Sequence, residues 1–489
     1  MNTAKILLTV CSTALTVILS VYYLHMLQLE GYFVSQFIHH LFARVRRPKL
    51  LFSQEKAKKP LHYTQRIIRL LVTVGILALL YNLCFTLFFF KGITNALHFP
   101  ATLFCLLCPI LSSVWVLIAC VITKPLEKII AAYYINDAKR ILKNRPDLKI
   151  IGITGSYGKT STKFILSTIL SEKYSVLTPP ASYNTTMGVV RVIRERLQPD
   201  DEVFVCEMGS RHKGDIKEIC DIVHPQKAVI TSIGPQHLDT FGSIEGVQAG
   251  KFELIESLPE NGSAVFSSLN EYIRELFDRA NCKKYSAGFL ETDDVRAENI
   301  SVGCSGSAFT LVTKQGSTEC FTSLLGKHNI SNILVAAAAA LDMGLTLEQV
   351  ASGIKKIRPV EHRLQIVNQK PVTVIDDAFN SSPDGASAAL DVLGAFTGRR
   401  IIVTPGFVEL GADEDKYHVA LGKKIKENAD VAILVGKKRT AKISEGLEGF
   451  KGEVYTVANL NEATALLSKI SVAGDAVLFE NDLPDNYNE

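Results

Sequence analysis

The chain has 489 residues, 47% of them hydrophobic, and its formal net charge of +4 comes largely from the first quarter of the sequence. This length exceeds what one hydrophobic core usually holds together, so several domains are expected, and the charge distribution gives no support for a nucleic-acid partner. The only C-x-x-C pair among the ten cysteines, Cys105 and Cys108, lies within an apolar stretch. The cysteines after the apolar stretches lack the paired spacing of a zinc site, so neither a zinc ribbon nor a disulfide framework is expected.

Three long apolar stretches, at about residues 6–29, 67–90 and 101–123, open the sequence. Each is near the ~20 residues that a helix needs to cross a bilayer, so three transmembrane helices are predicted. The alternative for the first stretch is a cleaved signal peptide. Its long apolar part and the absence of a small-residue cleavage site disfavour that interpretation.

The segment between the first two apolar stretches is strongly basic, with Glu30 and Glu55 as its acidic residues. Its basic residues are Arg44, Arg46, Arg47, Lys49, Lys56, Lys58, Lys59 and Arg66. Positive loops stay on the cytoplasmic side, so this loop and everything after Lys124 are expected in the cytoplasm, in a multi-pass protein of the plasma membrane. Binding of anionic lipid head groups is the other interpretation of this loop, and membrane lipid is therefore an expected partner.

Short β-rich runs alternate with amphipathic stretches after the apolar region, which is typical of an α/β fold. The boundaries expected from this pattern are a membrane domain at 1–135, a central domain at 136–360 and a C-terminal domain at 361–489. A β-rich insert is expected at 295–325, and Thr346 is expected to cap a helix. The alternation restarts after Pro359, which predicts a second doubly wound sheet.

Residues 150–163 read I-I-G-I-T-G-S-Y-G-K-T-S-T-K, an apolar run that breaks into a glycine-rich turn. Backbone N–H groups of such a turn, and of the helix that follows, bind anionic oxygens, while a lysine adds positive charge. The turn departs from the general spacing G-x-x-x-x-G-K-[ST], because Ile153 stands five residues before Gly158. The order of strand, glycines, lysine, hydroxyl and helix nevertheless predicts a nucleotide site formed by Gly155, Ser156, Tyr157, Gly158, Lys159, Thr160 and Ser161.

Three further polar residues come from successive predicted elements: Glu207 ends an apolar strand, His237 follows the next one, and Lys251 lies on the helix after it. Strand ends carry ligands in open α/β sheets, so these side chains are expected to converge near the phosphate loop. A lone histidine after a strand is as often structural as functional. Together with a carboxylate and a phosphate loop, however, it favours magnesium–nucleotide chemistry.

From about Lys149 onward the sequence resembles the Mur ligase family, the ATP-dependent amide ligases of cell-wall peptide assembly. The motifs that carry the resemblance are G-S-Y-G-K-T-S, E-M-G-S-R-H-K-G-D-I, H-L-D-T-F-G-S-I-E-G-V, L-P-E-N-G and D-D-A-F-N-S-S-P. They are most similar to the members that add D-alanyl-D-alanine. The resemblance implies a P-loop central domain followed by a Rossmann-like C-terminal domain.

The resemblance also implies roles for individual residues. Lys159 would contact the terminal phosphates of ATP, with Thr160, Glu207 and His237 as Mg²⁺ ligands. Lys251 matches the family's carbamylated lysine, which holds a second Mg²⁺. The catalytic group is thus Lys159, His237 and Lys251. Asn329, Asn332, Arg363 and Asp377 would contact the nucleotide, and Asn184, Thr185 and Asn380 would lie on the substrate side.

The implied activity is ATP-dependent amide-bond formation in peptidoglycan precursor synthesis, through an acyl phosphate. The implied partners are a cell-wall precursor carboxylate and an amino acid or dipeptide amine. Several departures from the family pattern leave the substrates open. The apolar stretches replace the family's domain that binds the UDP group, Thr185 stands where the family has a second asparagine, and Val190 stands where proline is usual. Near the C-terminus, F-E-N-D-L-P-D-N-Y stands where a stretch like Lys-Gly-Ser-Arg is expected, and G-F-V-E-L-G lacks an expected aspartate.

Four alternatives follow from these departures. One is a Mur-type ligase that acts on a lipid-linked precursor, and another is a ligase resembling poly-γ-glutamate synthases. A third is the amidotransferase-coupled ligase that acts on lipid II, which the lack of a zinc-type cysteine set disfavours. The fourth is a non-catalytic membrane scaffold, which would have no need of Lys159, Glu207 and Lys251 together.

Overall fold

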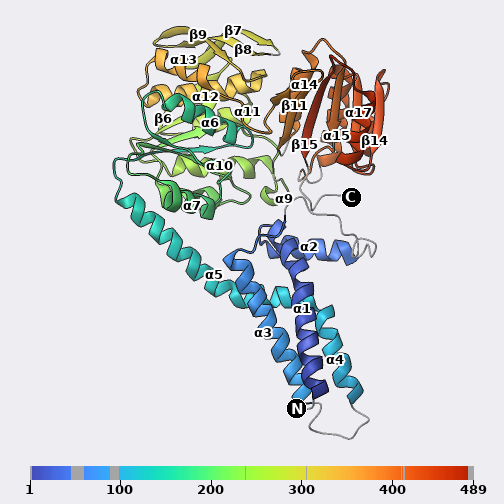
Figure 1. The fold of residues 1–489 in the computed structure, drawn as a ribbon. Helices are drawn as coiled ribbons and strands as arrows, with labels where there is room; N and C mark the ends of the chain where they lie inside the picture. The colour runs from blue at the N-terminus through green and yellow to red at the C-terminus, as the bar shows by residue number, and fades with distance from the viewer. Residues whose placement is uncertain are drawn as a thin grey trace. The chain divides into compact units, whose positions relative to one another are not determined.

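The computed structural model describes residues 3–45, 60–88, 98–236, 238–303, 305–379, 382–408, 410 and 413–482. The chain divides into two compact units, which we call unit 1 (Met1–Tyr133) and unit 2 (Tyr134–Leu483). Figure 1 shows helices alone in unit 1 and two sheets with helices in unit 2.

The described residues of unit 1 form five helices, the last of which continues into unit 2: α1 (Thr3–Leu29), α2 (Val34–Val45), α3 (Gln65–Phe88), α4 (His98–Ile110) and α5 (Ser112–Lys143). Two of them, over Ile6–Leu29 and Gln65–Leu87, are long and apolar enough to cross a membrane, by length and composition alone. Most of the predicted basic loop, residues 46–59, lies outside the described residues.

The predicted third span, at 101–123, is not one continuous helix, so the described residues hold two candidate spans, or three if a bent pair of helices counts as one. Leu103–Ile110 and Ser112–Lys143 meet at a bend of 69°. Pro109 lies beside the break and has no N–H to donate to the preceding turn, which is a usual cause of a kink.

Some polar side chains inside unit 1 are paired between helices. Ser12 Oγ donates to Asn82 Oδ1 (3.2 Å) and to the Cys105 carbonyl (2.6 Å), and Asn82 Nδ2 donates to Thr13 Oγ1 (3.0 Å). Asn82 is fully buried. Its hydrogen bonds therefore satisfy polar groups that would otherwise destabilise an apolar interior.

The first sheet of unit 2 has nine strands in the order β2-β3-β1-β4-β5-β6-β7-β8-β9. Its strands are β1 (Lys149–Thr154), β2 (Val176–Leu177), β3 (Val203–Glu207), β4 (Lys227–Ile230), β5 (Ser263–Ser267), β6 (Lys283–Gly288), β7 (Val295–Gly303), β8 (Gly306–Thr313) and β9 (Gly316–Thr322). Strands β2 to β7 pair in parallel, and β7, β8 and β9 form antiparallel pairs. The predicted β-rich insert therefore extends the parallel sheet at one edge.

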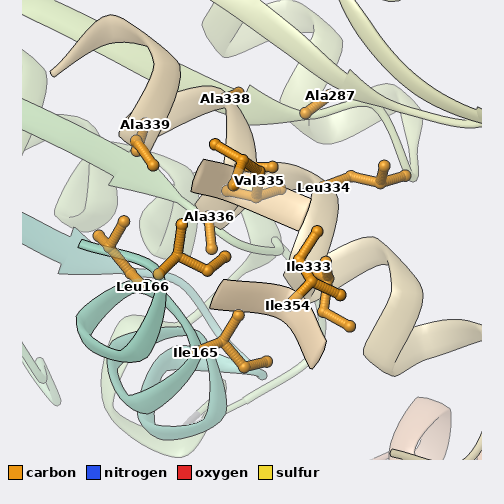
Figure 2. Close-up of a cluster of buried hydrophobic side chains, with 14 of the residues drawn as sticks. Ile165, Leu166, Ala287, Ile333, Leu334, Val335, Ala336, Ala338, Ala339 and Ile354 are labelled. Carbon is orange, nitrogen blue, oxygen red and sulfur yellow. The ribbon is translucent and has the colours of Figure 1, made fainter. Parts of the chain in front are cut away.

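Alternating apolar residues of β1 serve two cores. Ile151 and Ile153 face α6 (Lys159–Leu170), α12 (Lys327–Asp342) and α13 (Leu347–Lys356). Figure 2 shows Ile165 and Leu166 of α6 beside Ile333 and Ala336 of α12 and Ile354 of α13. Ile150 and Phe204 belong to the other core, with α7 (Thr186–Arg196), α8 (Asp215–Val223), α10 (Ile244–Glu256) and α11 (Glu271–Arg279). Helices on both faces explain why these strands are apolar throughout.

The second sheet has six strands in the order β10-β11-β15-β12-β13-β14. Its strands are β10 (Gln365–Asn368), β11 (Thr373–Phe379), β12 (Arg400–Thr404), β13 (Val431–Val435), β14 (Glu453–Val457) and β15 (Ala476–Asp482); its helices are α14 (Pro383–Gly394), α15 (Glu414–Asn428), α16 (Ala441–Gly446) and α17 (Leu460–Ile470). All pairs but β10–β11 are parallel. Buried apolar clusters lie on both faces, so the second doubly wound sheet is confirmed.

The predicted helix cap at Thr346 is confirmed. The hydroxyl of Thr346 accepts a hydrogen bond from the Gln349 amide (3.3 Å), and the Gln349 side chain accepts one from the Thr346 amide (2.9 Å). This reciprocal pair satisfies two N–H groups that the first turn of α13 leaves unpaired.

The carboxyl end of α12 is tied to the sheet by Asp342. Its side chain is 4% exposed and accepts hydrogen bonds from Lys227, from Ser263 Oγ (2.5 Å), from Tyr285 Oη (2.9 Å) and from Lys283 Nζ (3.1 Å). Burial alone would raise the pKa of Asp342. The hydrogen bonds, led by that from Lys227, outweigh it and lower the pKa from 3.8 to about 2.

Acid is expected to remove this stabilisation. A carboxyl group with a lowered pKa in the folded state stabilises the fold at neutral pH by about 2 kcal/mol, and this is lost as the pH falls from about 4 to about 2. Asp342→Asn should therefore lower the calorimetric midpoint at neutral pH, and its difference from wild type should shrink below about pH 4. Glu260→Gln, in an exposed loop, serves as the control. A difference that stayed constant down to about pH 2 would contradict the assignment.

Candidate functional site

The glycine-rich turn joins β1 to α6 through two glycines in backbone conformations that side chains rarely adopt. Gly155 has φ +151° and Gly158 has φ +77°. A Cβ atom on Gly155 would lie 2.1 Å from Thr231 Oγ1, and one on Gly158 would lie 2.5 Å from Asn332 Oδ1. Only glycine fits both positions, so the backbone can approach a ligand at the start of α6, where N–H groups favour anions.

Lys159, the first residue of α6, folds over this turn. Its Nζ donates to the carbonyl oxygens of Gly155 (2.5 Å) and Ser156 (3.0 Å). Burial lowers the pKa of Lys159 to about 8, although the nearby Glu207 carboxylate raises it; Arg363 lowers it further. The ammonium group thus lies over a cradle of backbone amides, which suits the phosphates of a nucleotide.

Glu207 ends β3 beside the turn and is 1% exposed. Its Oε1 accepts hydrogen bonds from Thr160 Oγ1 (3.0 Å) and from Asn184 Nδ2 (3.0 Å). Its Oε2 has no hydrogen-bond partner among the described residues, although Lys163 Nζ lies 3.3 Å away. A hydroxyl and a buried carboxylate with an available oxygen are the ligand types that Mg²⁺ takes, so Thr160 and Glu207 fit this ion.

Lys163 is a site residue that the sequence did not reveal. It is fully buried one helical turn after Lys159, and its Nζ also donates to the Ala181 carbonyl (2.8 Å). The signal that was available is a lysine inside the buried face of α6, next to Thr162 and Ile165. A lysine is almost never fully buried unless it is paired, so its position alone predicts a nearby acid.

Lys251 lies in α10 and is 1% exposed. Its Nζ donates to Ser210 Oγ (2.8 Å) and lies 5.9 Å from the centre of the Phe241 ring. Burial holds the pKa of Lys251 well below its usual range, and the positive charge of Lys159 lowers it further. The negative charges of Asp215 and Glu253 raise this pKa but do not outweigh burial. Burial thus favours the uncharged form of this side chain more than it would for an exposed lysine.

Glu253 does not neutralise Lys251 by direct contact. Its two carboxylate oxygens accept hydrogen bonds from the backbone amides of Gly214 (2.6 Å) and Lys217 (3.1 Å) at the start of α8. As an amine, Lys251 is no ligand for Mg²⁺, which prefers oxygen. His237 lies outside the described residues, and within the described part of the chain no three His, Cys, Asp or Glu side chains gather as a metal site.

The predicted substrate pair separates in the structure. Asn184 contacts Glu207, whereas Thr185 caps α7 by accepting a hydrogen bond from the Gly188 amide (3.3 Å). Asn380, the third predicted substrate residue, lies outside the described residues. The substrate roles of all three stay predictions.

The predicted nucleotide residues of α12 lie at the start of that helix. Asn332 has its Oδ1 against Gly158. Asn329 is buried and its Nδ2 donates to the Leu325 carbonyl (2.8 Å), so it also holds the segment that leads into α12. Both roles toward a nucleotide remain predictions.

Arg363 and Asp377 belong to the second sheet's domain. Burial lowers the pKa of Arg363, against the attraction of Asp377 and Glu207. Burial raises the pKa of Asp377 to about 6, although Arg363 and a hydrogen bond from the Leu364 amide (3.0 Å) lower it. The arginine thus interacts with acidic groups of both domains.

Comparison with known proteins finds two family matches in unit 2. Residues 153–340 match the Mur ligase middle domain, and residues 362–480 match the Mur ligase, glutamate ligase domain. The UDP-N-acetylmuramoyl-tripeptide–D-alanyl-D-alanine ligase of Escherichia coli strain K12 is 32% identical over 298 residues, which is 60% of this chain and 66% of the relative. The ligase of the same name from Haemophilus influenzae is 31% identical over 314 residues, or 63% of this chain and 68% of the relative. The chain thus spans about two thirds of the length of these relatives.

Solved structures agree with this comparison. The crystal structure of MurF from Acinetobacter baumannii has a TM-score of 0.67 and 28% identity, and the match covers 72% of this chain and 77% of that one. MurF from Thermotoga maritima, solved in complex with ADP, has a TM-score of 0.66 at 24% identity, covering 72% and 80% of the two chains, which shows the same fold.

The relatives contradict one prediction, the location in the plasma membrane as a multi-pass protein. The two ligases are named for a reaction on a UDP-linked precursor, and neither they nor the Acinetobacter baumannii enzyme is named as a membrane protein. The apolar helices of unit 1 indicate a membrane location through their length and composition alone. The predicted membrane-lipid partner has no support.

Sequence, fold and site lead to the same assignment. The shifted glycine-rich turn, the carboxylate at the end of β3 and the lysine of α10 all belong to the domain of the nine-stranded sheet, which is followed by the domain of the six-stranded sheet. Two family matches cover these two domains, and a relative at 31% identity is covered over 68% of its length. The chain belongs to the Mur ligase family.

Proposed function

We propose that the chain is an ATP-dependent amide ligase that joins D-alanyl-D-alanine to the peptide carboxylate of UDP-N-acetylmuramoyl-tripeptide. The observation that carries the proposal is the placement of Lys159 over the glycine-rich turn, beside Thr160 and the buried Glu207. The substrates follow from the names of the relatives. Mur ligases use ATP and Mg²⁺, and the residues of this site suit both.

The phosphate loop would position ATP and neutralise its charge. Phosphoryl transfer needs positioning and electrostatic stabilisation more than covalent help from the protein. Lys159 and the amides at the start of α6 would contact the terminal phosphates. Thr160 and Glu207 would hold Mg²⁺, which withdraws charge from phosphate oxygens when bound.

The reaction proceeds in two balanced steps. An oxygen of the substrate carboxylate attacks the γ-phosphorus, an O–P bond forms, and the bond to ADP breaks to leave an acyl phosphate. The amine of the dipeptide then attacks the carbonyl carbon, loses a proton and expels inorganic phosphate as the amide forms. Water would hydrolyse the acyl phosphate, so the second step needs an enclosed site.

Arg363 and Asp377 supply part of that enclosure. They lie in the second domain, yet Arg363 interacts electrostatically with Glu207 of the first. Holding both reactants between two domains converts the attack of the amine into an effectively intramolecular step.

We further propose that Lys251 carries a carbamate in the active enzyme. The neutral amine attacks the carbon of CO₂, a C–N bond forms and one proton leaves, which yields a carboxylate-like anion. The lowered pKa of Lys251 favours the amine form that this reaction requires. The two oxygen atoms of this carbamate, carried on the lysine nitrogen, would make the residue suitable for Mg²⁺.

Product formation by the full chain tests the proposed function. With ATP, Mg²⁺, UDP-N-acetylmuramoyl-tripeptide and D-alanyl-D-alanine, we expect phosphate release that depends on both substrates, and a product whose mass equals their sum less one water. Lys159→Ala should lower kcat/KM by about 10²-fold, the effect of removing one group that stabilises transferred charge. Lys213→Ala, an exposed lysine, is the control.

The alternatives give other outcomes in the same assay. Turnover with a lipid-linked tripeptide alone, or with glutamate as the amine, would replace the proposed substrates and keep the chemistry. If no amine or acceptor stimulated phosphate release, and Lys159→Ala left the cellular role intact, the ligase proposal would be overturned in favour of a scaffold.

A further inference from the structure

The segment that carries Arg363 has an unusual backbone. Residues His362 and Leu364, on either side of the arginine, both have positive φ, at 59° and 49°. Non-glycine residues rarely adopt this conformation, and a leucine has no side-chain group that compensates for it. Such a backbone persists only where its surroundings impose it, and it is often found at functional sites.

Two successive acids of β11 impose it. Asp376 Oδ2 lies 2.6 Å from His362 Nδ1, and Asp377 Oδ1 accepts a hydrogen bond from the Leu364 amide (3.0 Å). The other oxygen of Asp376 accepts one from the Ala378 amide (3.1 Å), so the carboxylate is fixed on its own strand. The residues on both sides of Arg363 are thus fastened to β11.

Backbone pairing continues the attachment. Gln365, two residues after the arginine, pairs with Asp376 in the antiparallel ladder between β10 and β11. The attachment fixes the backbone from which the side chain of Arg363 extends, and that side chain is half-buried and interacts electrostatically with Asp377 and Glu207. An arginine that must lose little freedom on binding is pre-organised for its ligand.

We propose that the Asp376–His362 pair is a positioning clasp that holds Arg363 in the orientation that binds the ATP phosphates. The clasp rests on the proposed function, because it assumes that Arg363 meets the nucleotide. His362 and Asp376 act through Arg363 and do not touch the ligand. Asp377 has a separate part, since it accepts a hydrogen bond from the Leu364 amide and interacts electrostatically with Arg363.

Glycine at position 362 separates the role of the ring from that of the backbone. His362→Gly keeps a residue that tolerates positive φ and removes the imidazole, whereas His362→Ala removes the imidazole and strains the backbone as well. Asp376→Ala removes the carboxylate, and Asp376→Asn retains an oxygen that can accept from His362 Nδ1. Glu361→Gln is the matched control, because Glu361 is exposed and 3.8 Å from His362 Nε2.

The experiment measures the dissociation constant of Mg²⁺–ATP by calorimetry on the full chain, without acceptor or amine. We expect His362→Gly and Asp376→Ala each to weaken binding about tenfold, within the range found for groups that orient a ligand-binding residue. Asp376→Asn should recover most of the affinity, and Glu361→Gln should leave it unchanged. His362→Ala should weaken binding at least as much as His362→Gly.

The double variant with Arg363→Ala decides the mechanism. If the clasp works only through Arg363, Asp376→Ala should have no further effect on affinity in an Arg363→Ala background, because coupled residues are not additive. Additive losses would overturn the proposal and indicate that His362 or Asp376 contacts the ligand. Full affinity in His362→Gly would also overturn it, because the ring would then be dispensable.

The clasp and the proposed function fail in different ways. If the wild-type chain binds Mg²⁺–ATP but forms no amide with the tested substrates, the proposed substrates fail while the clasp is still measured. If the wild-type chain binds no ATP, both fail together.

Discussion

Replacement of Lys163 by methionine is expected to destabilise unit 2 by about 3 to 5 kcal/mol, the usual effect of removing one partner of a buried ion pair. Lys163 and Glu207 are 0% and 1% exposed, with 3.3 Å between Nζ and Oε2. Methionine has about the same volume, so the cavity contribution is small. The variant would leave the buried Glu207 carboxylate without the charge of Lys163, with Thr160 and Asn184 as its hydrogen-bond donors.

The double variant Lys163→Met/Glu207→Gln should recover most of this loss. With both charges removed, neither member of the pair is left as an unpaired buried ion, and such paired replacements are often nearly neutral. Calorimetric midpoints of the two single variants and the double variant, measured on the full chain, give the coupling between the two residues. Lys355→Met, an exposed lysine of α13, is the control and should stay near wild type.

An additive double variant would contradict this account. It would mean that Lys163 stabilises the fold through its packing or through its hydrogen bond to the Ala181 carbonyl, and not through Glu207. The double variant should in either case be inactive, since Glu207 is a proposed Mg²⁺ ligand. Its stability is therefore the informative quantity.

This pair also shows what the sequence could and could not predict. The phosphate loop was predictable because strand, glycines and helix are consecutive, and each residue type has a local reason to be there. The contact between Lys163 and Glu207 joins α6 to the end of β3, so it depends on which strands are neighbours. The sequence predicted both strands but carried no direct signal for their order.

The same limit applies to the C-terminal domain. Its strands were predicted one by one from apolar runs, but β15, the last strand, lies between β11 and β12. That insertion places Glu480 beside Thr404, whose hydroxyl donates to it (2.6 Å). The departure at F-E-N-D was visible in the sequence, and its burial in the sheet was not.

Unit 1 and the segment before α7 show a second limit. Apolar length predicted helices at 6–29 and 67–90. It could not predict the bend beside Pro109, which arises because proline has no N–H to donate to the preceding turn, so a continuous third helix was wrongly expected.

Asn184 and Thr185 are adjacent and similar in polarity, yet Asn184 contacts Glu207 and Thr185 caps α7. Only the helix boundary, which falls between Thr185 and Thr186, distinguishes them.

Lys251→Ala is expected to lower kcat/KM by about 10³-fold, which corresponds to about 4 kcal/mol of lost transition-state stabilisation, because the proposed carbamate would no longer hold a metal ion. The folded state should not suffer. Lys251 is buried against Ser210 and Phe241, and burial of an amine without an acidic partner stabilises little. The calorimetric midpoint of Lys251→Ala should therefore lie close to that of wild type, which separates loss of activity from loss of fold.

A short carboxylate tests whether the missing group is an anion. Acetate at high concentration should restore part of the activity of Lys251→Ala, because it can place carboxylate oxygens in the space that the truncated side chain leaves. Removal of dissolved CO₂ and bicarbonate should lower the activity of wild type, and Lys217→Ala, on the neighbouring α8, should keep its activity without any gain from acetate. If acetate gave no rescue and wild type were indifferent to bicarbonate, Lys251 would act as an amine, and its lowered pKa would then serve to keep a second positive charge away from Lys159.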